Sequence, residues 1–311
     1  MNNRLMHMVL FSLAIIISPS TLAANISLIY DADSRYQQLF IKALSKQIIN
    51  KPTLTLTTIT TDKLSISTLN KNPPRVIISL NKTASHKLLT LKQGIPVFHA
   101  LTTLSKAKQY ASCLPNCLTS LPQHRFFILD QPPKRQIKLI QLIDSNIKDI
   151  GVIVTKQSSF FIQPLKKAIQ KSALNLNIHL TQASRVRYQI DDIARSSDII
   201  LAIPDSRVYN SSSLSQVLLT SYRHGTPVIG FSKGFMKAGA ISGVTSSLDQ
   251  LSQHLAESLI HIEPLAAHPH SFIYPRYFSV LSNRAVAKSL NINFPSDLEL
   301  ASEIRTDETD Q

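Results

Sequence analysis

The chain has 311 residues, of which 43% are hydrophobic and 17% are charged, and its formal net charge is +14. These values exclude an intrinsically disordered protein and describe a globular one, long enough for two medium-sized domains. The lysines are scattered along the chain and not clustered on one element, so the positive charge does not indicate a nucleic-acid-binding protein. A basic surface could attract anionic lipid headgroups or an acidic solute, but a proteome rich in lysine and asparagine is the plainer explanation.

The first residues have the order of a secretory signal peptide. Arg4 precedes a mostly apolar run over residues 8–17, and Ser18-Pro19-Ser20 then breaks the run. This run is shorter than the roughly 20 residues that a membrane-spanning helix needs. We expect cleavage after Ala23 and export to the periplasm. The alternative is an uncleaved anchor, which the proline and the small residues near the cleavage point disfavour.

After this segment, short β-branched runs alternate with amphipathic stretches. The first strand is followed by Asp33 or Ser34, either of which can cap a helix. Alternation of this kind predicts parallel sheets with helices on both faces. The expected strands are 26–30, 54–60, 76–80, 96–100, 126–129, 150–154, 176–180, 198–202, 227–231, 240–244 and 277–281. The expected helices are 36–48, 85–91, 134–143, 161–172, 190–195, 214–224, 248–260 and 283–290.

Two successive α/β units of similar size meet near residues 129–131, which predicts two lobes. After the signal peptide at 1–23, we place the N-terminal lobe at 24–129 and the C-terminal lobe at 130–261. Residues 262–298 then add a closing strand and helix that complete the lobes. Residues 299–311 are polar and acidic, and we expect a frayed tail.

Cys113 and Cys117 are the two cysteines of the chain. In an oxidising compartment a pair so close in sequence can close a small disulfide loop. The C-x-x-x-C spacing differs from that of thioredoxin-type redox motifs, and no second pair completes a zinc site. We therefore expect a structural disulfide.

The sequence lacks the common motifs of catalysis and cofactor binding. It has no G-x-S-x-G elbow, no H-E-x-x-H and no Walker loop, and its 7 glycines do not form a phosphate-binding loop. His261, Glu263, His268 and His270 could together hold a metal, but histidines in a proline-punctuated connector are more often surface residues. A hydrolase would need a nucleophile and base within reach of each other. We expect a non-enzymatic protein without metal or cofactor.

Candidate ligand contacts follow the predicted strands, because the carboxyl ends of parallel strands face a crevice. These loops carry small polar residues and a few aromatics, which suit hydrogen bonding and stacking on a small solute. Helix capping or turn formation is the plainer interpretation for most of them. The predicted ligand-binding residues are Asp31, Ser34, Asn81, His99, Ser158, Ser159, Phe160, Asp205, Tyr209, Asn210 and Ser232.

Five stretches of the second half carry a family resemblance. They are Leu129-Asp130-Gln131-Pro132; Ile150-Gly151-Val152-Ile153; Ala202-Ile203-Pro204-Asp205 with Val208-Tyr209-Asn210; Gly225-Thr226-Pro227-Val228-Ile229-Gly230-Phe231-Ser232 with Lys237-Ala238-Gly239-Ala240; and Phe278-Ser279-Val280 with Asn283-Arg284-Ala285-Val286-Ala287. In this order, over about residues 127–298, they resemble the periplasmic substrate-binding proteins of ABC transporters with the type I binding fold, in the branch that includes aromatic amino acid receptors. The first lobe fits in pattern only.

The resemblance implies an α/β fold of two Rossmann-like lobes with parallel sheets, joined by three crossovers, in the periplasmic binding protein type I architecture. It implies a ligand in the cleft, bordered by loops at Asp205, Tyr209 and Ser232, and hinge closure on binding. The implied function is capture of a small solute, amino-acid-like or aromatic, and its delivery to an ABC permease. Signalling to a membrane sensor or an outer-membrane partner is the alternative. We expect a monomer.

Overall fold

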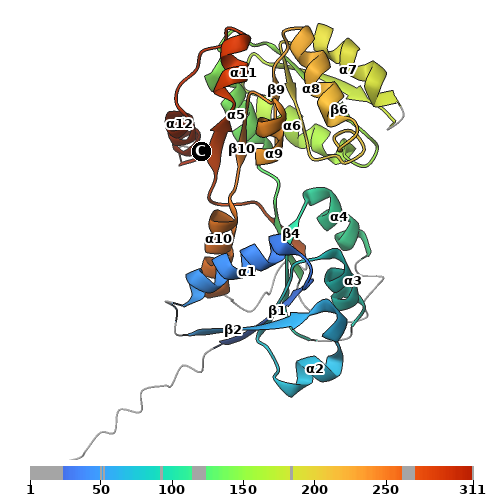
Figure 1. Ribbon diagram of the computed structural model, residues 1–311, viewed down its shortest axis with the longest axis vertical. Helices are drawn as coiled ribbons and strands as arrows, with labels where there is room; N and C mark the ends of the chain where they lie inside the picture. The colour runs from blue at the N-terminus through green and yellow to red at the C-terminus, as the bar shows by residue number, and fades with distance from the viewer. Residues whose placement is uncertain are drawn as a thin grey trace, which may run out of the picture.

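The computed structural model describes residues 24–49, 51, 53–91, 94–113, 124–182, 185–260 and 270–309. They form two α/β lobes, one above the other in Figure 1, each built around a six-stranded sheet. Within these ranges, no helix has the length and apolar character needed to cross a bilayer.

The first lobe has the strand order β11-β5-β4-β3-β1-β2, with every neighbouring pair parallel. Its strands are β1 (Ala24–Tyr30), β2 (Leu54–Thr60), β3 (Val76–Ser79), β4 (Val97–Thr102), β5 (His124–Ile128) and β11 (His270–Ile273). Its helices are α1 (Arg35–Ile48), η1 (Thr61–Lys63), α2 (Ile66–Lys71), α3 (Lys82–Thr90), α4 (Leu104–Cys113) and α10 (Leu248–Ile260).

Helices cover both faces of this first sheet, which is why its central strands are continuous apolar runs. In β3, Val76 and Ile78 face a core formed with α1 and α10, where Phe40 is buried. Ile77 faces the opposite core, where Leu88 of α3 packs. Successive side chains of one strand thus enter two different cores.

The second lobe has the strand order β12-β10-β9-β8-β6-β7, parallel except for β12, which pairs antiparallel with β10. Its strands are β6 (Asp149–Val154), β7 (Asn175–Leu180), β8 (Ile199–Leu201), β9 (Val228–Ile229), β10 (Ser242–Thr245) and β12 (Ser279–Ser282). Its helices are α5 (Pro133–Ile143), η2 (Ser159–Phe161), α6 (Ile162–Ile169), α7 (Val186–Arg195), α8 (Leu214–Arg223), α9 (Lys233–Ala238), α11 (Arg284–Ser289) and α12 (Asp297–Thr309).

Two expected boundaries differ from the structure. Helix α10 packs on α1 of the first lobe and buries Leu255 and Leu259 in the first-lobe core, although residues up to 261 were assigned to the second lobe. The frayed tail expected from residue 299 is wrong, since residues up to Thr309 form helix α12, whose Leu300 and Ile304 lie in the second-lobe core. Burial of Leu300, Ala301 and Ile304 on one face stabilises the helix although the segment is rich in acidic residues.

Several predicted features lie outside the described residues. These are the signal peptide at 1–23, Cys117, and His261, Glu263 and His268 of the histidine group. The disulfide between Cys113 and Cys117 therefore stays a prediction. Among the described residues, no group of His, Cys, Asp and Glu side chains is arranged to hold a metal ion.

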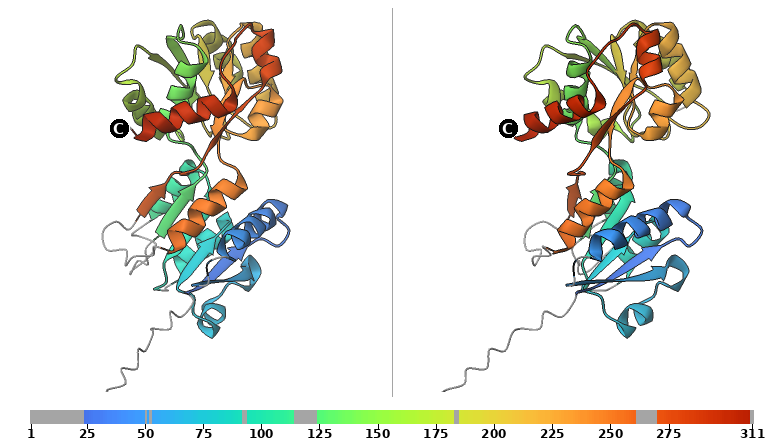
Figure 2. Two further views of the ribbon diagram at one scale, coloured as in Figure 1. Left: turned by 90° about the vertical axis from the view of Figure 1, so that its left-hand side faces the viewer. Right: turned by 60° about the vertical axis from the view of Figure 1, so that its left-hand side comes forward.

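Three crossovers join the lobes, as the family resemblance of the sequence implied. The chain passes from β5 to α5 through residues 129–132, from β10 to α10 through 246–247, and from β11 to β12 through 274–278 (Figure 2). Hydrogen bonds connect all three: Gln131 Nε2 donates to Ser246 Oγ at 2.9 Å, and Ser246 Oγ donates to the Tyr277 carbonyl at 2.6 Å. Gln131, Ser246 and Tyr277, one residue from each crossover, thus form a chain of two hydrogen bonds.

The three crossovers together form the hinge between the lobes, and Arg135, at the start of α5, lies at its centre. Its Nη1 donates to Gln131 Oε1 at 2.9 Å and to the Pro275 carbonyl at 2.6 Å, and its guanidinium lies 4.2 Å from the centre of the Phe278 ring. Its Nε and Nη2 form a two-point ion pair with Glu308 of α12, at 2.6 and 3.0 Å. A guanidinium offers five donors in a fixed plane, so one side chain can tie these segments together.

We predict that Arg135→Gln destabilises the protein by about 2–4 kcal/mol, because buried carbonyl groups and the Glu308 carboxylate lose their charged donor. The free energy of unfolding in urea at neutral pH measures this change. Arg195→Gln is the control, since Arg195 is 66% exposed and pairs with Asp191 on the same helix. That exposed pair should contribute little to stability, because solvent screens both charges. Equal costs for the two variants would show that the crossovers do not depend on Arg135.

Candidate functional site

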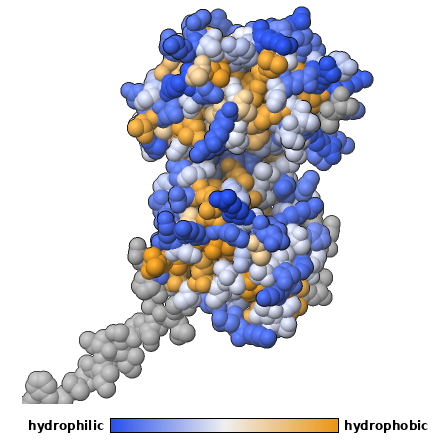
Figure 3. Space-filling model, in the orientation of Figure 1, coloured by the Kyte–Doolittle hydropathy of each residue, from blue (hydrophilic) through white to orange (hydrophobic). Residues whose placement is uncertain are grey.

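The two sheets point the carboxyl ends of their parallel strands toward each other. In the first lobe the chain leaves β5 at its carboxyl end and enters the second lobe, and in the second lobe it leaves β10 in the same way and returns. Ligands of open α/β sheets bind at this end of the strands. The candidate site is therefore the region between the lobes, where the molecule narrows in the space-filling view (Figure 3).

A cavity of about 230 Å³ opens at this end of the first lobe. Its charged and polar lining comes from the residues after β3, the end of β4 and the starts of α1, α3 and α4. Asn81 caps α3 through a 2.8 Å hydrogen bond from the Ala84 N–H, and Lys82 is the first residue of that helix. The lining residues include Tyr36, Gln37, Asn81, Lys82, Thr102, Lys106 and Tyr110. Two lysines beside a helix N-terminus favour a negatively charged group.

A second, smaller cavity of about 30 Å³ lies at the corresponding end of the second lobe. It is mostly apolar, with Phe231 after β9, Pro204 after β8 and Phe161 of η2 in its lining. Asp130 and Gln131 of the first crossover and Gln136 of α5 are its polar residues. The two halves of the candidate site therefore differ in chemistry, one basic and the other aromatic.

Leu101 marks the end of β4 by an unusual backbone conformation. Its φ is +54°, and the register between β4 and β5 shifts between His99 and Thr102. A left-handed conformation is costly for a branched side chain and is concentrated at functional sites. Leu101 lines the first-lobe cavity and also a small apolar cavity beside the hinge, so the strained residue lies where the strand meets both.

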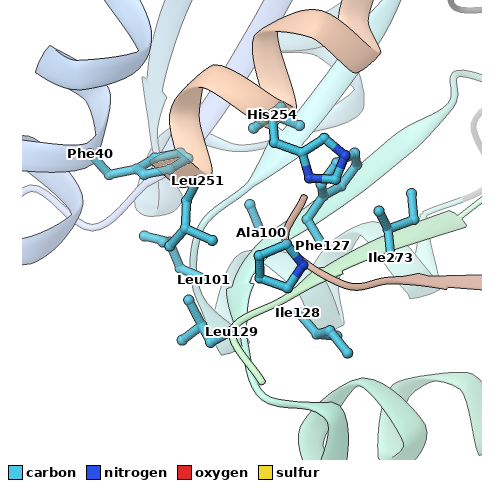
Figure 4. Close-up of a pocket in the computed structure, with 11 residues that line it drawn as sticks. Phe40, Ala100, Leu101, Phe127, Ile128, Leu129, Leu251, His254 and Ile273 are labelled. Atoms are coloured by element: carbon cyan, nitrogen blue, oxygen red, sulfur yellow. The ribbon is translucent and has the colours of Figure 1, made fainter. Parts of the chain in front are cut away.

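The small apolar cavity beside the hinge is a gap between packed side chains and not a ligand site. Side chains from α1, α10 and the third crossover converge on it, including Phe40, Leu251 and His254 (Figure 4). Its volume of about 10 Å³ is close to the lower limit for one water molecule. His254 Nδ1 accepts the Arg276 N–H at 3.3 Å, and burial and the nearby arginine charges lower the pKa of its imidazole.

Asp130 is a buried carboxylate within the first crossover. Its Oδ2 accepts the N–H of Leu104 at 2.6 Å, which ties the crossover to the start of α4. Within the part of the chain that the structure describes, Oδ1 has no hydrogen-bond partner. Burial raises the pKa of Asp130 to about 6, and the Asp130 charge in turn raises the pKa of Tyr274, which burial has already raised.

Most of the predicted ligand-binding residues have local roles in the structure. Asn81 lines the first-lobe cavity, in addition to capping α3. Ser34 and Ser232 cap α1 and α9 by accepting N–H groups of Gln37 and Phe235. The other local roles belong to Asp31, which accepts the Asp33 N–H, Ser159, which donates to the Lys156 carbonyl, and Asn210, which accepts the N–H groups of Ser212 and Ser213.

Asp205 fastens two loops of the second lobe to each other. Its carboxylate accepts hydrogen bonds from Thr155 Oγ1 at 2.7 Å, Ser158 Oγ at 2.5 Å and the Arg207 N–H at 2.9 Å. Burial acts to raise the pKa of this carboxyl, but the donors more than offset it, and the pKa is lowered. Asp205 and the predicted Ser158 thus satisfy each other within the lobe.

His99 lies inside the first lobe and does not reach the cleft. It is part of β4, not of the loop after it, and is fully buried. Its Nδ1 and Nε2 contact Ser85 Oγ at 2.9 Å and His124 Nδ1 at 2.8 Å, and its ring stacks on Phe126. Burial and the neighbouring imidazole lower the pKa of His99 well below its usual value, which disfavours the charged form of this side chain.

The two predicted aromatic contacts are also placed by packing. Tyr209 is buried against Phe231 and Phe235, and its hydroxyl has no hydrogen-bond partner among the described residues. Phe160 lies at the border of the lobes, with the ammonium of Lys108 from the first lobe 5.3 Å from its ring centre. Phe160 therefore makes a contact between the lobes near the hinge.

Sequence analysis missed the residues that give each cavity its chemistry. Lys82 and Lys106 follow β3 and β4 but belong to helices, so a search limited to loops passed over them. Asp130 and Gln131 were recognised as a family stretch and not as part of the site. The signal that could have found the lysines is their position within a few residues of a strand's carboxyl end.

Neither a protein-family model nor a curated protein matches the sequence. Solved structures do match over nearly the whole chain. An ABC domain from Streptococcus pneumonia in complex with L-Trp has a TM-score of 0.56 at 15% identity, covering 90% of this chain and 98% of its own. A conserved domain protein from Vibrio cholerae gives 0.56 at 16%, with the same coverage. The ligand-free, open form of a substrate binding protein with adhesive properties from Clostridium difficile gives 0.64 at 14%, covering 88% and 97%.

These similarities, at such low identity, establish the fold. The chain has the type I periplasmic binding protein fold of two α/β lobes, as the sequence resemblance implied. What its own cleft binds is decided by its own residues.

We predict that Asp130→Asn makes stability less dependent on pH. The folded-state pKa of about 6 lies above the ordinary 3.8, so the wild-type protein loses stability as the pH rises through this interval. Between pH 4 and pH 7.5 the variant should gain about 2–3 kcal/mol relative to wild type. Urea unfolding at both pH values measures the difference, and Asp249→Asn controls for the loss of one exposed carboxylate. An unchanged difference across this interval would contradict a raised pKa at Asp130.

Proposed function

We propose that this protein is an exported solute receptor that captures a small molecule between its lobes and delivers it to an ABC-type permease. The solute we propose has an acidic group and an apolar, ring-sized part. The observation that carries this proposal is the pairing of a basic first-lobe cavity with an aromatic second-lobe cavity at the facing ends of the two sheets.

The acidic end of the solute is assigned to the first lobe. Lys82 and Lys106 line its cavity, together with Asn81, Tyr36 and Thr102. No Asp or Glu lies among the described lining residues of this cavity, so the lysines there are not neutralised within it. Charge-assisted hydrogen bonds to a carboxylate are among the stronger polar contacts in proteins.

The apolar end is assigned to the second lobe, where Phe231, Phe161 and Pro204 offer ring and pyrrolidine faces. A solute that contacts both cavities stabilises the closed arrangement of the lobes, because only that arrangement satisfies both ends at once. The three crossovers bonded around Arg135 would serve as the hinge. The protein itself supplies no reaction in this scheme.

Delivery and export rest on different support. The fold is shared with solute-binding proteins, and the first residues of the sequence have the order of a secretory signal. Neighbouring genes test the delivery step: a permease and an ATPase favour uptake, whereas a kinase or cyclase favours signalling to a membrane sensor.

The binding proposal predicts that compounds with both a ring and a carboxylate raise the melting temperature in a concentration-dependent way. A thermal-shift panel of aromatic carboxylates, aromatic amino acids, aliphatic carboxylates, aromatic amines and sugars identifies the class. The double variant Lys82→Gln with Lys106→Gln should weaken binding of the best compound by at least about tenfold, measured by calorimetry. Phe231→Ala should weaken it by about tenfold through lost ring contact.

Lys42→Gln with Lys46→Gln is the matched control, because it removes two exposed charges from α1 outside the cavity. It should leave the affinity within about twofold of wild type. Binding that tolerates both cavity variants would place the solute elsewhere. A folded protein that binds no member of the panel would oppose the receptor proposal itself.

A further inference from the structure

A separate groove runs along the outside of the second lobe. It has a volume of about 570 Å³ and lies between α5 and the end of α6, beside the end of α12, which packs against α5. None of its lining residues belongs to either cavity of the cleft. The lining residues are Lys134, Ile137, Lys138, Gln141, Lys167, Ala168, Gln170, Lys171, Ser172 and Asp307.

The groove concentrates positive charge. Lys134 and Lys138 are one turn apart on α5, and Lys167 and Lys171 are four residues apart at the end of α6. One carboxylate, Asp307, is present in the described lining, and it lies 3.3 Å from Lys138. The described lining thus holds four lysines against one carboxylate, so its net charge is positive. A negatively charged surface would be attracted to it.

We propose that this groove docks the protein on an anionic phospholipid surface. The four lysines carry their charges on long, flexible side chains that reach phosphate groups at varied positions. Lysines near an anionic membrane each add to the attraction, and the net charge of +14 adds a long-range component of the same sign. Docking through this groove leaves both cavities of the cleft free to bind a solute.

The lining favours a membrane over two other anionic partners. All of its described residues come from helices or helix ends, so the groove offers no strand edge with which an extended acidic peptide could pair. Among the residues described in its lining there is also no aromatic side chain to orient an individual small molecule, whereas most solute sites have one. A membrane surface with many anionic headgroups requires neither a strand edge nor an aromatic side chain.

Vesicle co-sedimentation tests this inference on protein purified from cells that express the full-length chain. Vesicles of phosphatidylcholine with about one third phosphatidylglycerol are compared with pure phosphatidylcholine, at low and high salt. Wild-type protein should bind the anionic vesicles, and high salt should release it. Replacing Lys134, Lys138, Lys167 and Lys171 by Gln should weaken this binding by at least about tenfold.

The control replaces Lys42, Lys46, Lys71 and Lys288 by Gln, which removes the same charge from exposed positions outside the groove. It should retain binding within about threefold of wild type, and thermal melting confirms that both variants fold. Equal losses of vesicle binding in the two variants would overturn the proposal that the groove is the docking site, because only a general effect of charge would then remain. Protein that ignores the anionic vesicles would overturn membrane docking. So would protein that binds inorganic phosphate or polyglutamate through the same lysines without binding vesicles.

Discussion

The arrangement of the two lobes depends on one buried guanidinium. Arg135 holds the first crossover through Gln131 and the third through the Pro275 carbonyl, and Gln131 reaches the second crossover through Ser246. Because the described chain passes from lobe to lobe at these three crossovers, their contacts help to set the direction in which each sheet points. The same guanidinium pairs with Glu308, so a helix at the end of the chain helps to fix the hinge in its middle.

The site that results is divided between two kinds of surface. The first lobe contributes lysines, an amide and hydroxyls, and the second contributes aromatic rings. Neither half encloses a solute by itself, since the larger cavity is about 230 Å³, below the usual range for ligand pockets. Recognition of an amphipathic solute would therefore require both lobes, which couples binding to movement at the hinge.

The fold could be predicted from the sequence because its signals are local. Apolar runs such as residues 76–79 and capping residues such as Asn81 define strands and helices without reference to distant residues. The site could not be predicted to the same degree, because its chemistry depends on what lies opposite each residue. From the sequence, Asp205 and His99 both look like ligand contacts. In the structure Asp205 accepts hydrogen bonds from Thr155 and Ser158, and His99 pairs with His124. Helix α12 was missed because its acidic surface residues outnumber the three buried ones.

The position of β11 and β12 bears on how the protein folds. These strands come from residues 270–273 and 279–282, yet they form an outer edge of the first and the second sheet respectively. Until they are in place, β5 and β10 have unpaired edges, and neither lobe is a continuous piece of chain that could finish folding early. Both lobes must therefore wait for the last part of the polypeptide, so they complete their folding together. Such a chain remains incompletely folded until residues 270–282 have been synthesised.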